Sequence, residues 1–344
     1  MRIGALISRS GPAGLWGPST EACAILAAGE LNVGGGVAGR DVELFVADPG
    51  WTETEAAAVA ADLVDIAEVD AIVGMHPSNV RQVIKQQIGG RVPYYYTPQY
   101  EGGEVAPSTV AIGGTDSWLM KQTLPWFTER RRARRFCLIA NDYVWPQMAM
   151  ETASALISEA GGWVAGRIVA PFEGDYAEAL DTVRQIKPDV VIMLLLGAEA
   201  VRFNRAFAAV GLQRDTLRFG LGIDENVLLG IGPDGTEGLY AATTFTLAEH
   251  SLQAERLSDL YRGSFGEFAP SLSVFGQSCY EGIHLAVEMA RRCGSPRGRD
   301  VAHYVAGLRR DSIRSMLPRS KFEERLRMNF VVADGIDWRI ISPQ

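Results

Sequence analysis

Residues 176–196 read YAEALDTVRQIKPDVVIMLLL, an amphipathic helical window followed by an almost uninterrupted apolar run. An apolar run of this length, with β-branched residues at its start, is typical of a strand that is buried on both faces. Strands of this kind belong to parallel sheets that are covered by helices. The stretch therefore predicts an α/β fold.

The same alternation fills the first two thirds of the chain. It begins with the strand RIGALIS at 2–8 and restarts with RFCLIA at 135–140, so two similar βαβ modules lie in tandem, each with its own sheet. After about residue 245 the pattern changes to long helical windows, which lie at 254–265, 271–292 and 300–308. The last residues predict a hairpin around Asp334 and Gly335.

A helical tail that is too long for one module suggests that the chain returns to the first lobe. We expect two Rossmann-like lobes, each a parallel sheet flanked by helices, joined by a hinge with three crossovers. The expected lobes are residues 1–117 with 246–318, and residues 118–245 with 319–344. Ligands of open parallel sheets bind beyond the carboxyl ends of the strands, so we expect a ligand cleft between the two lobes.

Composition excludes several classes of protein. Apolar residues make up 47% and charged residues 22% of the 344 residues, which excludes a disordered chain. The formal charge of −8 argues against direct nucleic-acid binding, and the basic run RRRARR at 130–135 is interpreted as a solvated helix end. No apolar run approaches the roughly 20 residues that cross a bilayer, so no membrane insertion is expected.

The first residues, MRIGALIS, enter a strand directly and lack the pattern of a secretion signal. Taken literally, this start indicates the cytoplasm. A mature exported chain whose signal peptide had been removed would look the same. The expected location is therefore the periplasm if a signal has been removed, and otherwise the cytoplasm.

Signals for cofactors and catalysis are weak. The stretches GGGVAG at 34–39 and GIGPDG at 230–235 match G-x-G-x-x-G, but neither stands between a strand and a helix as a dinucleotide loop does. The sequence has no Walker A motif, no HExxH, no G-x-S-x-G and no zinc-like cluster. The four cysteines are interpreted as buried small side chains. We expect no cofactor, no metal and no catalytic residue.

Polar and aromatic side chains gather instead at the predicted strand exits of the first lobe. Ser10 lies in a glycine-rich loop after the first strand, and His76 and Ser78 follow the strand DAIVG. The hydroxyl of Ser78, at a helix start, can bind a carbonyl or carboxylate oxygen or simply cap the helix. Tyr96 ends the next strand, and the wall after it is expected to include Pro98 and Gln99.

The second lobe offers rings and carboxylates at equivalent places. Tyr143 and Trp145 follow a strand with a spacing of two and are expected to project together. Asp224 and Glu225 end another strand; adjacent residues point to opposite sides, so one can enter the cleft while the other caps the next turn. Which of the two enters stays open. Rings with a few hydroxyls describe a site for a small solute.

At these residues the chain resembles the type I periplasmic-binding-protein fold, in its group for branched-chain amino acids and for amides or urea. The resemblance covers essentially the whole chain and rests on four stretches in order: SGPAGLWG, LNVGGGVAGRDVELFVAD, AIVGMHPSNVRQVI and DYAEALDTVRQIKPDVVIMLL. Within the group, DPG at 48–50, TPQYEGG at 97–103 and NDYVWPQ at 141–147 are most similar to a cytoplasmic amide sensor and to urea and amide transport receptors.

This resemblance implies that Ser78, Tyr96 and Tyr143 bind a small amide. Trp145 stands where the amide sensor has a tyrosine, His76 replaces another tyrosine, and Pro98 with Gln99 replaces a Thr-Pro pair. These departures imply that the site is reshaped, so the ligand need not be acetamide or urea.

The function expected is that of a non-enzymatic solute-binding protein that closes on a small amide or urea-like ligand and serves an ABC importer, with an ABC permease as its partner if exported. The alternatives are a cytoplasmic amide-responsive regulator of an amidase operon, with a regulatory protein as its partner, and a receptor for a branched-chain or aromatic amino acid. An enzyme that acts on a small amide through His76 or Glu225 is the alternative from a different class.

Overall fold

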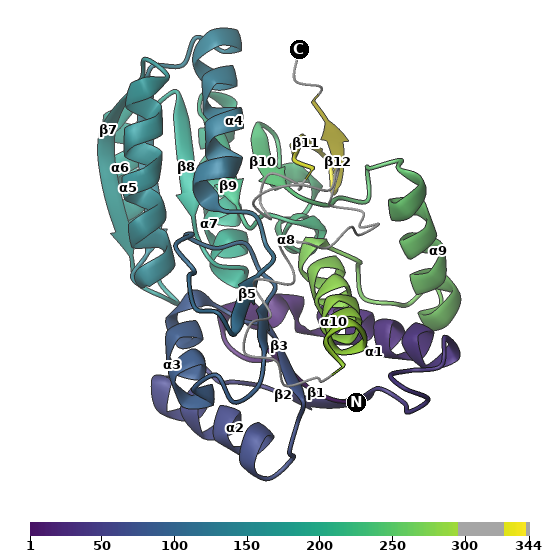
Figure 1. The fold of residues 1–344 in the computed structure, drawn as a ribbon. Coiled ribbons are helices and arrows are strands. Elements are labelled where there is room, and N and C mark those ends of the chain that lie inside the picture. Colours follow the sequence, from purple (N-terminus) through teal and green to yellow (C-terminus); the bar gives the residue numbers. More distant parts are fainter. Residues whose placement is uncertain (295–326, 342–344) are drawn as a thin grey trace. The chain divides into compact units, whose positions relative to one another are not determined.

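Figure 1 shows the computed structural model of the chain, which describes residues 1–294 and 327–341. The described chain divides into two compact units, and it passes between them after residues 114, 249 and 327. Unit 1 comprises Met1–Gly114 with His250–Arg327, and unit 2 comprises Thr115–Glu249 with Met328–Gln344. The helix expected at 300–308 and the expected return of the chain at residue 318 lie outside the described residues.

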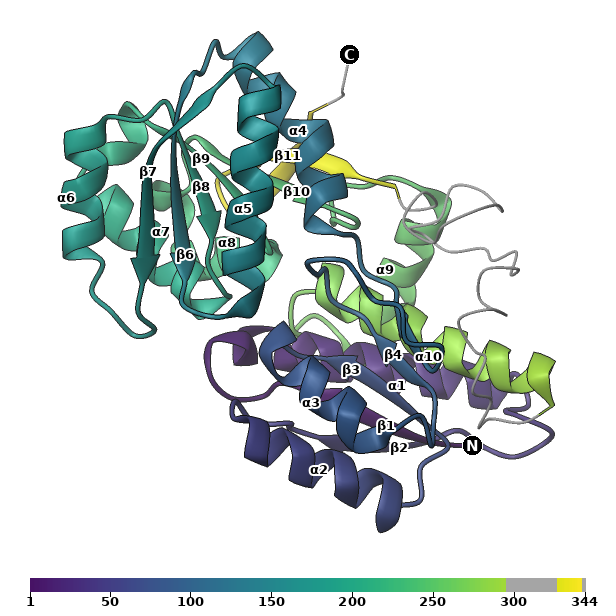
Figure 2. The same cartoon turned by 60° about the vertical axis from the view of Figure 1, so that its left-hand side comes forward.

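Unit 1 is built on a five-stranded sheet of order β2-β1-β3-β4-β5, in which every pairing is parallel. Its strands are β1 (Arg2–Ile7), β2 (Glu43–Ala47), β3 (Ala71–Met75), β4 (Tyr94–Tyr96) and β5 (Thr109–Ala111). Its helices are α1 (Gly17–Val33), α2 (Glu53–Asp65), α3 (Ser78–Ile88), α9 (Leu252–Phe265) and α10 (Val274–Cys293), with a 3-10 turn η1 (Pro12–Trp16). Figure 2 shows α2 and α3 together on one face of this sheet, with α1 and α10 on the other.

Unit 2 has a seven-stranded sheet of order β12-β11-β10-β9-β8-β6-β7. Its strands are β6 (Arg135–Asn141), β7 (Trp163–Ala170), β8 (Val190–Leu194), β9 (Leu217–Leu221), β10 (Leu239–Thr243), β11 (Asn329–Asp334) and β12 (Asp337–Ile340). Its helices are α4 (Asp116–Arg130), α5 (Val144–Glu159), α6 (Ala177–Ile186), α7 (Ala198–Ala209) and α8 (Glu225–Ile231), with 3-10 turns η2 (Leu212–Arg214) and η3 (Pro233–Gly235). The strands from β6 to β10 are parallel, and β11 and β12 form the antiparallel hairpin expected at the end of the chain.

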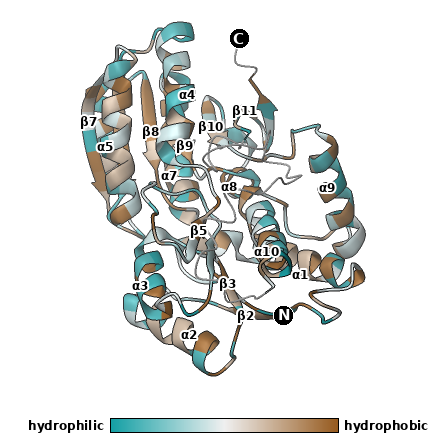
Figure 3. Cartoon of the chain, viewed as in Figure 1, coloured by the Kyte–Doolittle hydropathy of each residue, from teal (hydrophilic) through white to brown (hydrophobic). Residues whose placement is uncertain are grey.

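The apolar run that predicted the fold becomes β8, which lies between β6 and β9 in unit 2. Every residue of β8 is buried, because helices cover both faces of the sheet at this position. In Figure 3 strand β8 is mainly hydrophobic in colour, whereas helix α3 carries both hydrophilic and hydrophobic segments. The structure therefore confirms the predicted α/β architecture of two lobes.

Glycines of the stretch at 34–39 make a backbone turn. Helix α1 ends at Val33, and Gly36 has a φ of +59°. A Cβ on Gly36 would lie 1.9 Å from the carbonyl oxygen of Arg40, which pairs with Val37 across the turn. The Gly36 carbonyl also accepts a hydrogen bond of 2.7 Å from Arg291 of α10. This stretch therefore connects α1 to the next strand and packs against α10.

We predict that Gly36→Ala destabilises the protein by at least about 2 kcal/mol, because alanine is strained at this φ and its methyl group meets backbone atoms. The matched control is Gly29→Ala at an exposed position near the end of α1, where nothing lies within 4 Å of the added Cβ. That change should stabilise the helix by about 0.5–1 kcal/mol. Urea denaturation of the two variants measures both effects, and equal stabilities would contradict the account.

Candidate ligand-binding site

The exits of strands β3 and β4 bring two hydroxyl groups together in unit 1. The two strands are parallel, and Gly74 pairs with Tyr96, so both chains leave the sheet at the same edge. Pro77 precedes α3 with a φ of −64° and a ψ of 159°, which starts the helix at Ser78. As a result, the Ser78 Oγ lies 3.3 Å from the Tyr96 hydroxyl. The structure thus brings together two of the residues that the sequence predicts to bind ligand.

His76 forms hydrogen bonds with Tyr94 and Tyr96 of β4. Its Nδ1 lies 3.0 Å from the Pro77 carbonyl oxygen, which can only accept, so Nδ1 carries the proton. Its Nε2 then accepts a hydrogen bond of 2.8 Å from the Tyr94 hydroxyl. The Tyr96 hydroxyl donates to the His76 carbonyl oxygen at 2.8 Å. Both ring nitrogens are therefore engaged inside unit 1, and this geometry provides no general base.

Burial determines the charge of the His76 ring, and the glycine at position 74 leaves space for it. Burial lowers the pKa of His76 to about 4, so the ring is neutral at physiological pH. A Cβ on Gly74 would lie 2.7 Å from the Nε2 atom of His76 and 3.0 Å from the Tyr94 ring. Glycine at 74 is therefore what allows the histidine to reach Tyr94.

A buried arginine lies one turn further along α3. The side chain of Arg81 is 2% exposed, and its Nη2 donates to Glu101 Oε1 at 2.7 Å. Nη1 lies 3.8 Å from Glu104 Oε2. The Cζ atom lies 5.0 and 5.1 Å from the ring centroids of Tyr96 and Tyr100. Among the described residues, Nε and Nη1 have no hydrogen-bond partner. A charge this deeply buried depends on its carboxylate partners.

Glu101 joins the arginine to the serine. Its Oε2 accepts a hydrogen bond of 2.7 Å from Ser78 Oγ, while its Oε1 accepts the one from Arg81. Its side chain is only 6% exposed. The loop that carries Glu101 connects β4 to β5 and is held a second time by Glu104, which accepts hydrogen bonds of 3.1 Å from Lys85. Glu101 and Glu104 of the loop therefore form ion pairs with Arg81 and Lys85 of α3.

The other residues predicted in unit 1 lie around this cluster. Ser10 is exposed in the loop before η1. Pro98 is buried directly after β4, and a Cβ on Gly113 would meet its carbonyl carbon at 2.3 Å. Gln99 is half-buried, and its Nε2 has no hydrogen-bond partner among the residues that the structure describes. As ligand contacts, all three stay predictions.

In unit 2 the predicted ring pair lies at the start of α5. The ring centroids of Tyr143 and Trp145 lie 6.1 Å apart, and Phe172 lies 5.9 Å from Tyr143. Trp145 is buried in the hydrophobic core of the unit, and its Nε1 donates to Asp116 Oδ2 at 2.8 Å. Tyr143 is only partly buried. Of the two rings, Tyr143 therefore retains the larger surface for a ligand.

The two carboxylates after β9 have different roles. Asp224 caps helix α8, since its Oδ1 accepts from the Val227 amide at 3.0 Å. Glu225 Oε1 accepts hydrogen bonds of 2.9 Å from the Thr246 hydroxyl and from the Leu247 amide. Its Oε2 is buried and has no hydrogen-bond partner in the described part of the chain. Burial, together with the charge of Asp224, raises the pKa of Glu225 to about 7.

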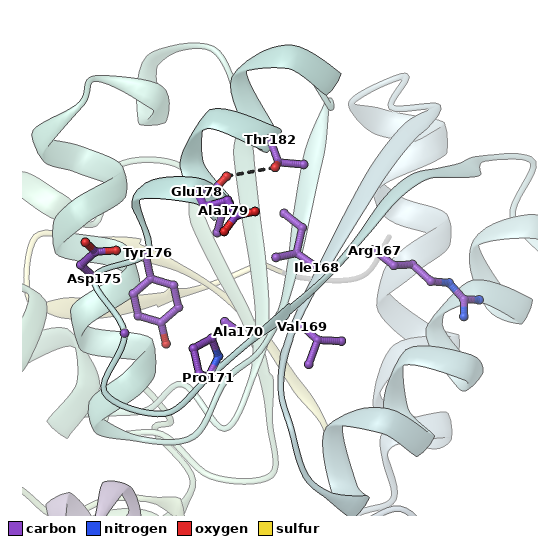
Figure 4. Close-up of a pocket in the computed structure, with 11 residues that line it drawn as sticks. Arg167, Ile168, Val169, Ala170, Pro171, Asp175, Tyr176, Glu178, Ala179 and Thr182 are labelled. Atoms are coloured by element: carbon purple, nitrogen blue, oxygen red, sulfur yellow. Dashed lines mark hydrogen bonds between the residues drawn. The ribbon is translucent and has the colours of Figure 1, made fainter.

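Unit 2 also contains a cavity of about 340 Å³ between β7 and α6 (Figure 4). Arg167, Tyr176 and Thr182 line it, together with neighbouring residues of the strand and helix. The Tyr176 hydroxyl donates to the buried Glu199 at 2.7 Å. None of the residues predicted to bind ligand lines this cavity.

Three further polar residues, Arg81, Glu101 and Asn141, were not predicted from the sequence. Asn141 ends β6; its Oδ1 accepts from the Leu196 amide at 3.0 Å, and its Nδ2 lies 3.5 Å from the Ala170 carbonyl oxygen, so it links three strand exits. A usable signal was present: an arginine three residues after the helix-starting Ser78, and a glutamate in the loop that follows the next strand.

Comparison with known proteins agrees with this two-unit architecture. The family model described as periplasmic binding protein matches residues 1–329. The chain therefore belongs to the periplasmic binding protein family, and it is a binding protein rather than an enzyme. None of the described helices is long and apolar enough to cross a membrane.

Several solved structures share the fold at low sequence identity. An ABC transporter substrate-binding protein from Sphaerobacter thermophilus is 20% identical, with a TM-score of 0.81 over 100% of this chain and 97% of that one. A branched-chain amino acid transporter substrate binding protein from Streptococcus pneumoniae, in complex with isoleucine, is 18% identical, with a TM-score of 0.83 over 100% and 99%. A solute binding protein from Rhodopseudomonas palustris, in complex with 3,4-dihydroxy benzoic acid, is 18% identical, with a TM-score of 0.83 over 99% and 94%.

We predict that Arg81→Met destabilises the protein by about 3–5 kcal/mol, because it leaves the buried carboxylate of Glu101 without its cation, whereas Glu104 keeps Lys85. The control is Arg184→Met, which removes an exposed pair with Asp181 and should cost less than about 1 kcal/mol. Denaturation in urea gives both values. A loss for Arg81→Met no larger than that of the control would contradict the structural role of the arginine.

Glu225 should make stability depend on pH. Its pKa is raised from 4.5 to about 7 on folding, so the folded state binds the proton more tightly than the unfolded state. Stability is therefore highest below the unfolded pKa and falls as the pH rises through the folded pKa. At about 1.4 kcal/mol per pKa unit, wild type should lose about 3 kcal/mol relative to Glu225→Gln between about pH 4.5 and about pH 8.

The measurement is denaturation of wild type and Glu225→Gln over this pH range. Because the two proteins share every other titrating group, the difference between them isolates Glu225. A difference that does not change with pH would contradict the buried, protonated state of this carboxyl group.

Proposed function

We propose that this chain is the substrate-binding component of an ABC importer, with an ABC permease as its partner and the periplasm as its location. The proposed ligand is a small neutral molecule with N–H donors, such as a short-chain amide or urea. The solved structures named above support the transport role, because they are substrate-binding or solute-binding proteins of transporters.

The ligand class is inferred from the directions in which the hydroxyl groups of Ser78 and Tyr96 donate their protons. The Ser78 hydroxyl donates to Glu101 at 2.7 Å, and the Tyr96 hydroxyl donates to the His76 carbonyl oxygen at 2.8 Å. Each hydroxyl has one proton, so the longer contact of 3.3 Å between the two oxygens is left without a strong donor. Both oxygens can still accept hydrogen bonds.

Two acceptors this close together suit a ligand that donates two N–H groups. A primary amide or urea has an NH₂ group with two donors in one plane, whereas a carboxylate has none. A carboxylate would place its negative charge beside two oxygen lone pairs and close to Glu101. The proton arrangement therefore favours the amide-like ligand over an acid.

A receptor for a branched-chain or aromatic amino acid is the second candidate. The buried Oε2 of Glu225, which has no hydrogen-bond partner among the described residues, favours it, because such an oxygen can accept from an ammonium group. Two of the solved structures named above contain isoleucine and 3,4-dihydroxy benzoic acid. The regulatory alternative and the ligand role of Tyr143 stay predictions.

A thermal-shift screen tests the proposal, because a ligand that binds only the native state raises the melting temperature as its concentration rises. We expect acetamide, longer primary amides or urea to stabilise wild type more than the matching carboxylates do. In Ser78→Ala the amide affinity should fall by about tenfold, since one acceptor of the pair is lost.

The control for this experiment is Ser154→Ala on α5, which removes a half-buried hydroxyl from unit 2 and should leave amide binding unchanged. Stabilisation by leucine, isoleucine or an aromatic amino acid, with none by any amide, would replace the amide proposal by the amino acid receptor.

A further inference from the structure

Glu101 places a carboxylate on two side-chain donors at the start of α3. Its two oxygens divide between the two donors of the first turn of α3, one on Ser78 Oγ and one on Arg81 Nη2, both at 2.7 Å. The chain therefore fills this anion site with a carboxylate of its own. Among the described residues, the Nε and Nη1 atoms of Arg81 are buried without hydrogen-bond partners, and Nη1 faces Glu104 Oε2 at 3.8 Å, so Arg81 keeps donor capacity beyond its bond to Glu101.

We propose that Glu101 is the residue that sets the charge class of the ligand, by holding the Ser78 proton away from the ligand and neutralising Arg81, so that wild type accepts N–H donors and rejects carboxylates. This inference rests on the proposed function only in the choice of the amide as the accepted ligand. The anion site itself follows from the contacts of Glu101 with α3.

The isosteric change Glu101→Gln reverses this arrangement. Oε1 of the glutamine continues to accept from Arg81, and its NH₂ group takes the place of the oxygen that faced Ser78. That NH₂ group can only donate, so Ser78 must accept from it and turn its own proton outwards. At the same time the substitution removes the full negative charge that faces Arg81. In Glu101→Gln, Ser78 therefore donates a hydrogen bond to the ligand instead of accepting one. The positive charge of the neighbouring Arg81 is also less fully balanced.

Acetamide and acetate are the probes, because they have nearly the same shape and differ in charge and donors. In calorimetric titrations we expect wild type to prefer acetamide. In Glu101→Gln the ratio of acetamide affinity to acetate affinity should fall by at least about tenfold, because one hydrogen bond is reversed and one charge is removed. Sodium chloride at equal ionic strength controls for general salt effects.

Glu104→Gln is the matched control. It removes one negative charge from the same loop, also near Arg81, but Glu104 contacts Lys85 rather than Ser78. If Glu101 acts through Ser78, Glu104→Gln leaves the ratio of affinities near that of wild type. An equal fall in both variants would overturn the assignment to Glu101 and reduce the effect to the net charge of the loop.

A second variant tests the anion site without any amide. Glu101→Ala removes the side-chain atoms beyond Cβ, and acetate contains the same number of carbon and oxygen atoms. Acetate should therefore raise the melting temperature of Glu101→Ala, and should do so more than sodium chloride or acetamide, while it leaves wild type unchanged. This readout compares melting temperatures within one variant, so it holds even if that variant is less stable.

The two experiments separate the failure of this inference from that of the proposed function. If wild type binds no amide but acetate rescues Glu101→Ala, the amide proposal fails and the anion site filled by Glu101 stands. If wild type binds acetamide but acetate gives Glu101→Ala no more stability than chloride does, and Glu101→Gln keeps the wild-type preference, the inference is overturned and the proposed function stands.

Discussion

The buried ion pair between Arg81 and Glu101 is the interaction on which the candidate site depends. An arginine side chain that is 2% exposed requires a carboxylate, and this partner comes from the loop after the next strand rather than from the same helix. The pair therefore ties this loop to α3. Because the second oxygen of Glu101 accepts from Ser78, the same interaction also determines the direction of a hydroxyl proton at the helix start.

The strand beneath this pair determines the direction of the second proton. Gly74 leaves room for His76, and His76 is held neutral between Pro77 and Tyr94. The backbone of His76 then presents its carbonyl oxygen to the hydroxyl of Tyr96. Histidine at this position therefore acts as a support for the tyrosines, and its neutral state is a consequence of burial rather than a catalytic device.

The fold could be predicted from the sequence, because it depends on the periodicity of apolar residues and on the order of strands and helices along the chain. Apolar runs such as 190–196 alternate with amphipathic helices, and parallel strands place their exits at one edge, which is why Ser78 and Tyr96 were predicted together. The pairing of Arg81 with Glu101 was not predictable in this way. From helical periodicity alone, an arginine is predicted to face the solvent. The burial of Arg81 depends instead on how the loop between β4 and β5 folds back onto α3. The capping role of Asp224 likewise needed the geometry of α8.

Neutron diffraction from crystals of the deuterated protein would show the directions of the Ser78 and Tyr96 hydroxyl protons, because it locates the exchanged protons themselves. We expect the Ser78 deuteron on the line to Glu101 Oε2, the Tyr96 deuteron pointing to the His76 carbonyl oxygen, and no deuteron on Glu101. A deuteron on Glu101, or a Ser78 deuteron directed at Tyr96, would contradict this arrangement.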